Sequence, residues 1–262
     1  MRLFSHTCSN TEIVCALDCA DLLIGIDTDS DYPPEVVAPL PKLGRDLDLD
    51  VAGVLALKPD LVLTSLTVPG HERIVGQLEA AGVRTLVCDP LSLEDIYGDI
   101  RRIAQTLGVA RRGERLVDEM RAAMPRITLP RPPKVLIEWW PKPVIAPARQ
   151  SWATDLVELA GGVNPWSGID AKSAPLEDAQ IIAAAPDAVV MSWCGVKEEN
   201  YRADIVRRRP GWERVPAVLN ECIVPITEAW LGRPGPRLVE GYRALRDVIL
   251  SASEGSGAVP QR

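Results

Sequence analysis

Short apolar runs alternate with amphipathic segments through the first hundred residues. The runs predicted as strands are RLFSH, LLIGID, DLVLTS and VRTLVC, and the segments predicted as helices between them are NTEIVCALDCADL, DLDVAGVLALKP and HERIVGQLEAAG. Buried parallel strands are apolar throughout, and each needs a crossover helix to reach the next. The pattern therefore predicts an α/β fold with a largely parallel sheet covered by helices on both faces.

A proline-rich break, TLPRPPK, interrupts this alternation near residue 130 and follows the helical run ARRGERLVDEMRAAMPRI. Beyond it the alternation resumes with KVLIEWW, a strand predicted to lead into a proline-stiffened loop. The predicted organisation is an N-terminal α/β lobe over 1–107, a connecting helix and linker over 108–132, a C-terminal α/β lobe over 133–251, and a disordered tail over 252–262.

The two halves of the chain repeat one pattern. Residues 51–65, VAGVLALKPDLVLTS, and residues 178–192, DAQIIAAAPDAVVMS, each combine a helical run, Pro-Asp and an apolar strand that ends in serine, with an offset of 127. The repeat predicts two similar Rossmann-like lobes joined by one long helical connection. Because ligands of such folds bind at the carboxyl ends of parallel strands, the expected site is a cleft between the lobes.

Composition narrows the class of function. A net charge of −7 argues against nucleic acid, and Arg207, Arg208 and Arg209 lie among acids, which favours a solvated helix face. Six cysteines without CxxC pairs and two histidines predict free thiols and neither a metal site nor a catalytic triad. Phosphate-loop, dinucleotide-binding and nucleophile-elbow motifs are all absent. We therefore expect no catalytic residues, and a protein that is not an enzyme.

The choice of aromatic residues favours binding. Seven tryptophans and four tyrosines stand against a single phenylalanine. Indoles and phenols combine apolar area with a polar group, which suits half-buried recognition surfaces better than a core.

Several motifs then carry a resemblance over nearly the whole chain. They are 9-SNTEIVCAL-17, 30-SDYPP-34, 56-ALKPDLVLTS-65, 71-HERIVGQLEAAGV-83, 158-ELAGGVN-164, the Pro-Gly-Trp at 210–212 and 229-AWLGRPGPRLVEG-241. In this order they resemble the substrate-binding proteins of ABC importers for vitamin B12, siderophores and haem, and most of all the BtuF-like cobalamin-binding proteins. SDYPP is the element that favours cobalamin. The resemblance implies two lobes, one connecting helix and a monomer that binds cobalamin as transported ligand, with no catalytic cofactor.

A flat macrocycle fringed with amides calls for exposed aromatic area and a few polar groups. The ligand-binding residues expected on this basis are Tyr32, Pro33, Trp230 and Arg233 at matched positions, and Trp139, Trp140 and Trp193 at unmatched ones. Trp193 ends a predicted strand, whereas Tyr32 could equally cap a loop. Strand alternation places one of Trp139 and Trp140 in the core, and we expect Trp140 to face the ligand. The resemblance places an aromatic residue where this chain has Leu66-Thr67, an area that Trp139 or Trp140 could replace.

The resemblance also implies a partner, an ABC permease dimer that contacts one glutamate on each lobe. Glu72 matches the first of these positions, and the repeat offset leads from Glu72 to Glu199, with Glu198 as the neighbouring alternative. A glutamate favoured by a helix dipole is the simpler interpretation of Glu72.

Three alternatives remain open at this point. A haem-binding protein would need an axial ligand such as Tyr32 or His71, and a siderophore-binding protein would use arginines such as Arg45, Arg149 and Arg233. The third is a cytoplasmic corrinoid-binding protein, since the N-terminus lacks the features of a secretory signal. The resemblance itself implies a periplasmic or otherwise extracytoplasmic location.

Overall fold

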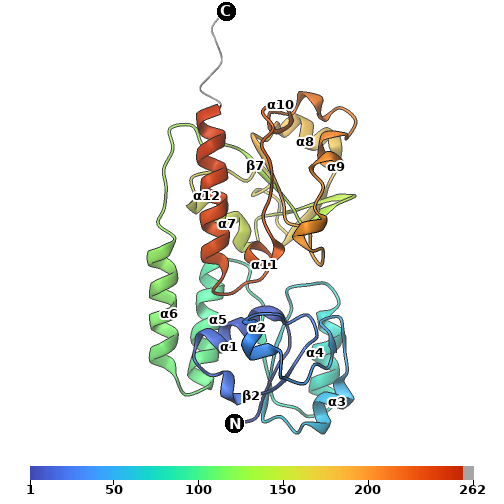
Figure 1. Cartoon of the computed structure of the whole chain (residues 1–262), viewed down its shortest axis with the longest axis vertical. Helices are drawn as coiled ribbons and strands as arrows, with labels where there is room; N and C mark the ends of the chain where they lie inside the picture. Colours follow the sequence, from blue (N-terminus) through green and yellow to red (C-terminus); the bar gives the residue numbers. More distant parts are fainter. Residues whose placement is uncertain (256–262) are drawn as a thin grey trace, which may run out of the picture. The chain divides into compact units, whose positions relative to one another are not determined.

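The computed structural model describes residues 1–255 of a mixed α/β protein (Figure 1). The chain divides into two compact units. Unit 1 comprises residues 1–90 and 94–120, and unit 2 comprises residues 91–93 and the chain from Arg121 onward. Among the residues described, no helix has both the length and the apolar composition that crossing a membrane requires.

Unit 1 is built on a four-stranded parallel sheet in the order β2-β1-β5-β6. Its strands are β1 (Leu3–Ser5), β2 (Leu23–Ile26), β5 (Leu61–Ser65) and β6 (Thr85–Cys88), and a small hairpin is formed by β3 (Gly44–Arg45) and β4 (Asp48–Leu49). The helices are α1 (Cys8–Ala16), α2 (Pro34–Val37), α3 (Val51–Ala56), α4 (His71–Ala80), α5 (Leu93–Thr106) and α6 (Ala110–Ala123). Strand β5 is buried over its whole length because helices cover the sheet, as its apolar sequence predicts.

Unit 2 contains a three-stranded parallel sheet in the order β7-β11-β12. Its strands are β7 (Val135–Glu138), β11 (Ala188–Met191) and β12 (Ile223–Pro225), and an antiparallel sheet is formed by β8 (Trp140–Pro141), β9 (Val144–Pro147) and β10 (Ser173–Leu176). The helices are α7 (Trp152–Leu159), α8 (Asp178–Ala184), α9 (Ala203–Arg207), α10 (Pro216–Leu219), α11 (Glu228–Leu231) and α12 (Leu238–Gly255). The core contains Trp166 and Trp212, 6% and 0% exposed.

The internal repeat is visible in the hydrogen bonds of both units. In unit 1, Asp60 accepts a hydrogen bond from the Arg2 backbone N–H at 2.6 Å, and the Arg2 side chain donates to the Leu57 carbonyl at 2.7 Å. In unit 2, Asp187 accepts from the Lys134 backbone N–H at 2.8 Å, and Lys134 Nζ donates to the Ala184 carbonyl at 2.8 Å.

The aspartate of each Pro-Asp thus holds the start of the neighbouring strand, and the basic residue there satisfies a carbonyl at the end of the preceding helix. Helices α3 and α8 begin at 51 and 178, and strands β5 and β11 begin at 61 and 188, so the offset of 127 holds through the module. The repeat therefore marks one structural module used twice.

The segment after β7 differs from the prediction. In place of a strand over 134–140 and a loop, β7 ends at Glu138, and β8 pairs with β9 as a short antiparallel hairpin, with Trp140 opposite Ile145. Pro141 is tolerated because β8 is the edge strand of its sheet, where a missing N–H costs little, and Pro143 lies in the turn that leads to β9.

The predicted disorder of the tail is wrong for residues 252–255, which continue α12. Ala252 is 8% exposed, so packing extends the helix into a stretch whose small polar composition suggests disorder. Residues 256–262 lie outside the described residues. Residues 108–132, the expected connection, contain α6, and the division between the units falls within this helix, after Met120.

Candidate functional site

The carboxyl end of the unit 1 sheet has a buried layer of hydroxyl and amide groups. Thr7 Oγ1 lies 3.0 Å from Ser65 Oγ, and the Asn10 side chain donates to Ser65 Oγ at 3.1 Å. Thr7 has a φ of 81°, a left-handed conformation that costs energy for a β-branched residue. Its N–H is held by Asp27 Oδ2 at 3.0 Å. These hydrogen bonds connect the ends of β1 and β5 with the N-terminus of α1.

Asp27 connects this hydrogen-bond network to the SDYPP segment. Its carboxylate accepts the Ser30 hydroxyl at 2.7 Å and the backbone N–H groups of Asp29 and Ser30 at 2.9 and 3.0 Å. Burial raises the pKa of Asp27, while these hydrogen bonds act in the opposite direction. Tyr32 and Pro33 follow directly, with Tyr32 42% exposed and Pro33 half-buried before α2. The expected pair therefore lies on a surface loop fixed to the end of β2.

A buried histidine pair lies in the same unit. His6 Nε2 donates to the Asp46 carbonyl at 2.7 Å, because a carbonyl oxygen can only accept, and Nδ1 accepts from the Thr64 hydroxyl at 2.7 Å. The His71 ring meets the His6 ring edge to face at 5.3 Å. Burial is the main reason that the pKa of His6 falls to about 4. Both ring nitrogens of His6 are committed to protein partners.

In unit 2, the carboxyl end of β7 carries a buried ion pair that the sequence interpretation missed. Glu138 is 0% exposed and is held by Arg209, whose NH1 contacts Oε1 and whose NH2 lies 3.2 Å from Oε2. The Arg209 side chain is 10% exposed, so its assignment to a solvated face is wrong. Arg207 and Arg208 do lie on that exposed face, with side chains 42% and 82% exposed. A glutamate that ends an apolar strand was the available signal.

The three tryptophans near this ion pair lie in different environments. Trp193 is 3% exposed, donates its indole N–H to Glu138 Oε2 at 3.3 Å and packs on Tyr201. It is a core residue in this structure and offers no open ring face. Trp139 is half-buried, whereas Trp140 is 41% exposed and donates its indole N–H to the Lys142 carbonyl at 3.2 Å. The structure thus places Trp140, and not Trp139, on the open face of the hairpin.

Trp230 and Arg233 lie at the C-terminal side of the unit 2 sheet, on and just after α11. Trp152 donates its indole N–H to the Leu231 carbonyl at 2.8 Å, and Arg233 pairs with Glu228 at 3.6 Å. A Cβ atom on Gly241 would come within 2.3 Å of the Trp230 carbonyl oxygen, so only glycine lets α12 pass this close. Trp230 itself is half-buried on a short helix that is fixed from three sides.

The two glutamates expected to contact a permease are both exposed. Glu72 lies in the first turn of α4 and accepts the Gly70 backbone N–H at 2.9 Å. Glu199 lies in a single 3₁₀ turn, Glu198–Asn200, ahead of α9. The segment after β11 therefore reproduces the position of α4 in the repeat, but with a shorter helix.

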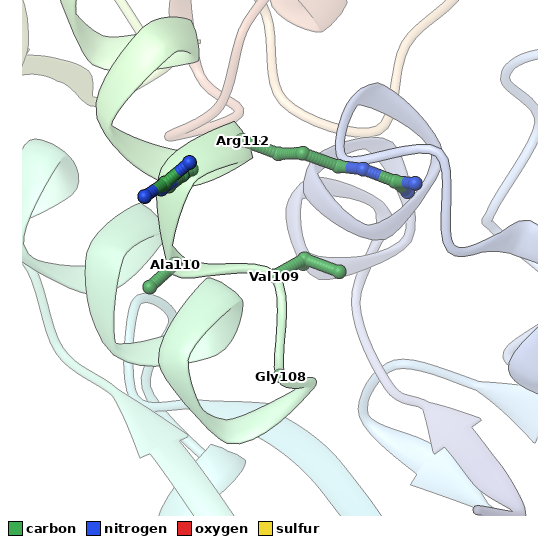
Figure 2. A pocket seen from close by; sticks show the side chains of 5 residues that line it. Gly108, Val109, Ala110 and Arg112 are labelled. Carbon is green, nitrogen blue, oxygen red and sulfur yellow. The ribbon is translucent and has the colours of Figure 1, made fainter.

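Two hollows lie in unit 1. One of about 420 Å³ is lined by residues 108–112 at the start of α6 (Figure 2). Its Arg112 reaches across to α1 and donates to the carbonyls of Leu17 and Asp18 at 3.0 and 2.9 Å. Another, of about 300 Å³, lies beside β6 and α5 and includes Asp99, whose pKa burial raises to about 6. Among the described residues, no cluster of three or more His, Cys, Asp or Glu could hold a metal.

Comparison with known proteins decides the family. The sequence model described as periplasmic binding protein matches residues 5–229, which is most of the chain. This chain is a member of the periplasmic binding protein family. That assignment confirms the predicted family and the two-lobed α/β fold class, and it identifies the chain as a solute-binding protein of the ABC-importer type rather than an enzyme.

Relatives of this periplasmic binding protein are named for different solutes. It is 28% identical to an uncharacterized ABC transporter substrate-binding lipoprotein, YvrC, of Bacillus subtilis over 95% of this chain and 79% of the relative. It is 26% identical to a vitamin B12-binding protein of Vibrio vulnificus over 90% of this chain and 85% of the relative. The solved apo structure of the periplasmic haem-binding protein RhuT from Roseiflexus superposes with a TM-score of 0.81 at 28% identity, over 96% and 98% of the two chains.

Proposed function

We propose that this protein captures cobalamin or a related corrinoid and delivers it to an ABC permease. The observation that carries the choice of ligand is the similarity to vitamin B12-binding proteins over 90% of the chain. The structure supports it with two exposed aromatic side chains that follow parallel strands, Tyr32 on the loop after β2 and Trp140 in β8, directly after β7. Flat apolar area at such ends suits a corrin ring.

The test of this proposal is a direct titration. Purified protein is titrated with cyanocobalamin, haemin and a ferric hydroxamate siderophore, followed by calorimetry and by the visible spectrum of each ligand. Cyanocobalamin is expected to saturate one site per chain at the lowest concentration. Tighter binding of either rival ligand, or no binding of cyanocobalamin at all, overturns the proposal.

Trp140 is expected to supply direct ligand contact. Because its ring is exposed and oriented by the hydrogen bond to Lys142, Trp140→Ala should weaken cyanocobalamin binding about tenfold, the usual loss for an aromatic anchor. Trp139→Ala should weaken it less, since that indole is half-buried. Leu219→Ala, which truncates a 66% exposed side chain of the same unit, is the matched control. If both tryptophan variants bind cyanocobalamin with the affinity of the wild-type protein, this hairpin does not contact the ligand.

Haem is the second candidate, favoured by the likeness to RhuT. Its iron would need an axial ligand, and the histidines are poorly placed to supply one, since His6 and His71 are 0% and 1% exposed and His6 uses both nitrogens. The exposed phenol of Tyr32 would then be the group to coordinate iron.

Tyr32→Phe separates the two ligands because it removes the phenol oxygen and keeps the ring. Cobalamin bound through ring contact should lose less than about threefold in affinity, whereas iron–phenolate coordination would be lost with its charge-transfer absorption. Tyr32→Ala is the companion variant, and it should weaken cobalamin binding as well. A phenylalanine variant that loses cobalamin but retains haemin would contradict this assignment.

The proposed partner is the permease of an ABC importer, and the proposed location is extracytoplasmic, as for other proteins of this family. Glu72 and Glu199 are the proposed contacts on units 1 and 2. Their exposure supports this role, and neither side chain is part of a core.

A further inference from the structure

Arg209 joins three separate parts of unit 2. Its guanidinium group holds the buried Glu138 carboxylate with both terminal nitrogens, and NH2 also donates to the Pro141 carbonyl at 3.0 Å. On its other side, the guanidinium carbon lies 4.5 Å from the centre of the Trp212 ring. A planar group with several donors can satisfy such a set at once, which a lysine ammonium cannot do in the same geometry.

The carbonyl that Arg209 reaches belongs to the residue after Trp140. Strand β8 contains only Trp140 and Pro141, and the residue before it, Trp139, donates its backbone N–H to the Ile145 carbonyl of β9 at 2.8 Å. An exposed two-residue edge strand has little burial to hold it in place. The contact with Arg209 ties it instead to the end of β7 and to the segment after α9.

We propose that Arg209 is a positioning residue that fixes the β8–β9 hairpin so that Trp140 meets the ligand in a preorganised orientation. This inference rests on the proposed function for its readout in binding. Arg209 does not contact the ligand in this scheme, and it acts through Glu138 and the Pro141 carbonyl. Rigid support reduces the entropy that binding would otherwise spend on ordering the hairpin.

The test uses variants that leave no buried charge unpaired. Arg209→Met alone would strand the Glu138 carboxylate in the core and endanger folding. The double change Glu138→Gln with Arg209→Met removes both charges while a glutamine side chain remains beside the Trp193 N–H. Arg209→Lys keeps the charge but loses the simultaneous contact with Pro141. Arg208→Met is the matched control, since that side chain is 82% exposed.

Hydrogen exchange of the ligand-free protein is the first readout. The backbone amides of residues 139, 140, 142 and 144–146 should exchange faster in Glu138→Gln/Arg209→Met and in Arg209→Lys, with the rest of unit 2 and the Arg208→Met control unchanged. This result does not depend on which ligand binds. Unchanged protection of the hairpin in both variants overturns the proposal even if cobalamin binding is confirmed.

A double-mutant cycle with Trp140→Ala is the second readout. Trp140→Ala and the Arg209 variant that is paired with it should each weaken cyanocobalamin binding about tenfold. The protein that combines them should bind no more than about twofold more weakly than either, because both changes remove the same contact. Losses that multiply to about a hundredfold would show that Arg209 acts independently of Trp140, and would overturn the proposal. Wild-type protein that binds no corrinoid refutes the proposed function, and hydrogen exchange then decides the role of Arg209 alone.

Discussion

Reversing the charges of Glu72 and Glu199 together is expected to abolish ligand delivery to the permease while cobalamin affinity stays within about twofold of wild type. Both side chains are exposed and lie outside the cores of their units. A lysine at each position would place like charges against the basic groups expected on the permease, and such a pairing costs several kcal/mol. Transport of labelled cyanocobalamin and ligand-stimulated ATP hydrolysis by the reconstituted importer measure delivery, and calorimetry measures affinity.

The control reverses two other exposed glutamates, Glu79 on α4 and Glu213 after α9. This pair changes the net charge by the same amount, so it separates contact with the permease from a general electrostatic effect. Glu198→Lys tests the neighbouring position in unit 2. Full transport by the Glu72→Lys/Glu199→Lys variant, or a parallel loss of cobalamin binding, would refute the docking assignment.

A second large effect is expected from acidification, through His6. The pKa of His6 is about 4 in the folded protein against 6.5 in a free chain, so the unfolded state binds more protons between these values. The free energy of unfolding therefore falls as the pH drops from 6.5 to 4, by about 3 kcal/mol from this residue. Burial is the main cause that disfavours the charged imidazolium form of His6, and the neighbouring His71 adds to it. The backbone carbonyl and the carboxylate of Asp46 favour the charged form.

Urea unfolding of wild type and His6→Gln isolates this contribution. Asp99, with its pKa raised to about 6, gains protons on folding and acts in the opposite direction, but it does so equally in both proteins. Wild type should be the more stable protein at pH 7.5, and its advantage should shrink by about 3 kcal/mol by pH 4. With only two histidines in the chain, NMR can follow the His6 ring directly. A His6 signal that titrates near pH 6.5 would contradict the buried neutral form.

The fold was predictable because its signals are local. Strand β5 begins with an apolar run at residues 61–63 and is wholly buried, and the Pro-Asp that precedes it recurs before β11. The β8–β9 hairpin was not predictable in the same way. Three prolines in ten residues suggest a loop, yet Pro141 lies in β8 at a sheet edge, Pro143 lies in the turn, and Pro147 ends β9.

The candidate site was predictable only where exposure follows from local sequence. Tyr32, in a proline-rich turn, and Trp140, two residues after the apolar strand β7, are both exposed. Trp193 also follows an apolar strand, yet it is buried because Glu138, 55 residues earlier, meets its indole N–H, and Tyr201 packs against its ring. Arg209 shares a run of three arginines with Arg207 and Arg208, and its partner lies 71 residues earlier. Partners at such separations leave no trace in periodicity or composition.

The module that Asp60 and Asp187 complete has a consequence for how the protein is made. In unit 1, Arg2 completes the connection between α3 and β5, and the whole of that unit precedes residue 121 in the chain. Every contact of its sheet is therefore available once the first half of the chain has been synthesised. The first unit can complete its fold while the second is still being translated, and the second then needs only Lys134 and Asp187 to begin the same closure.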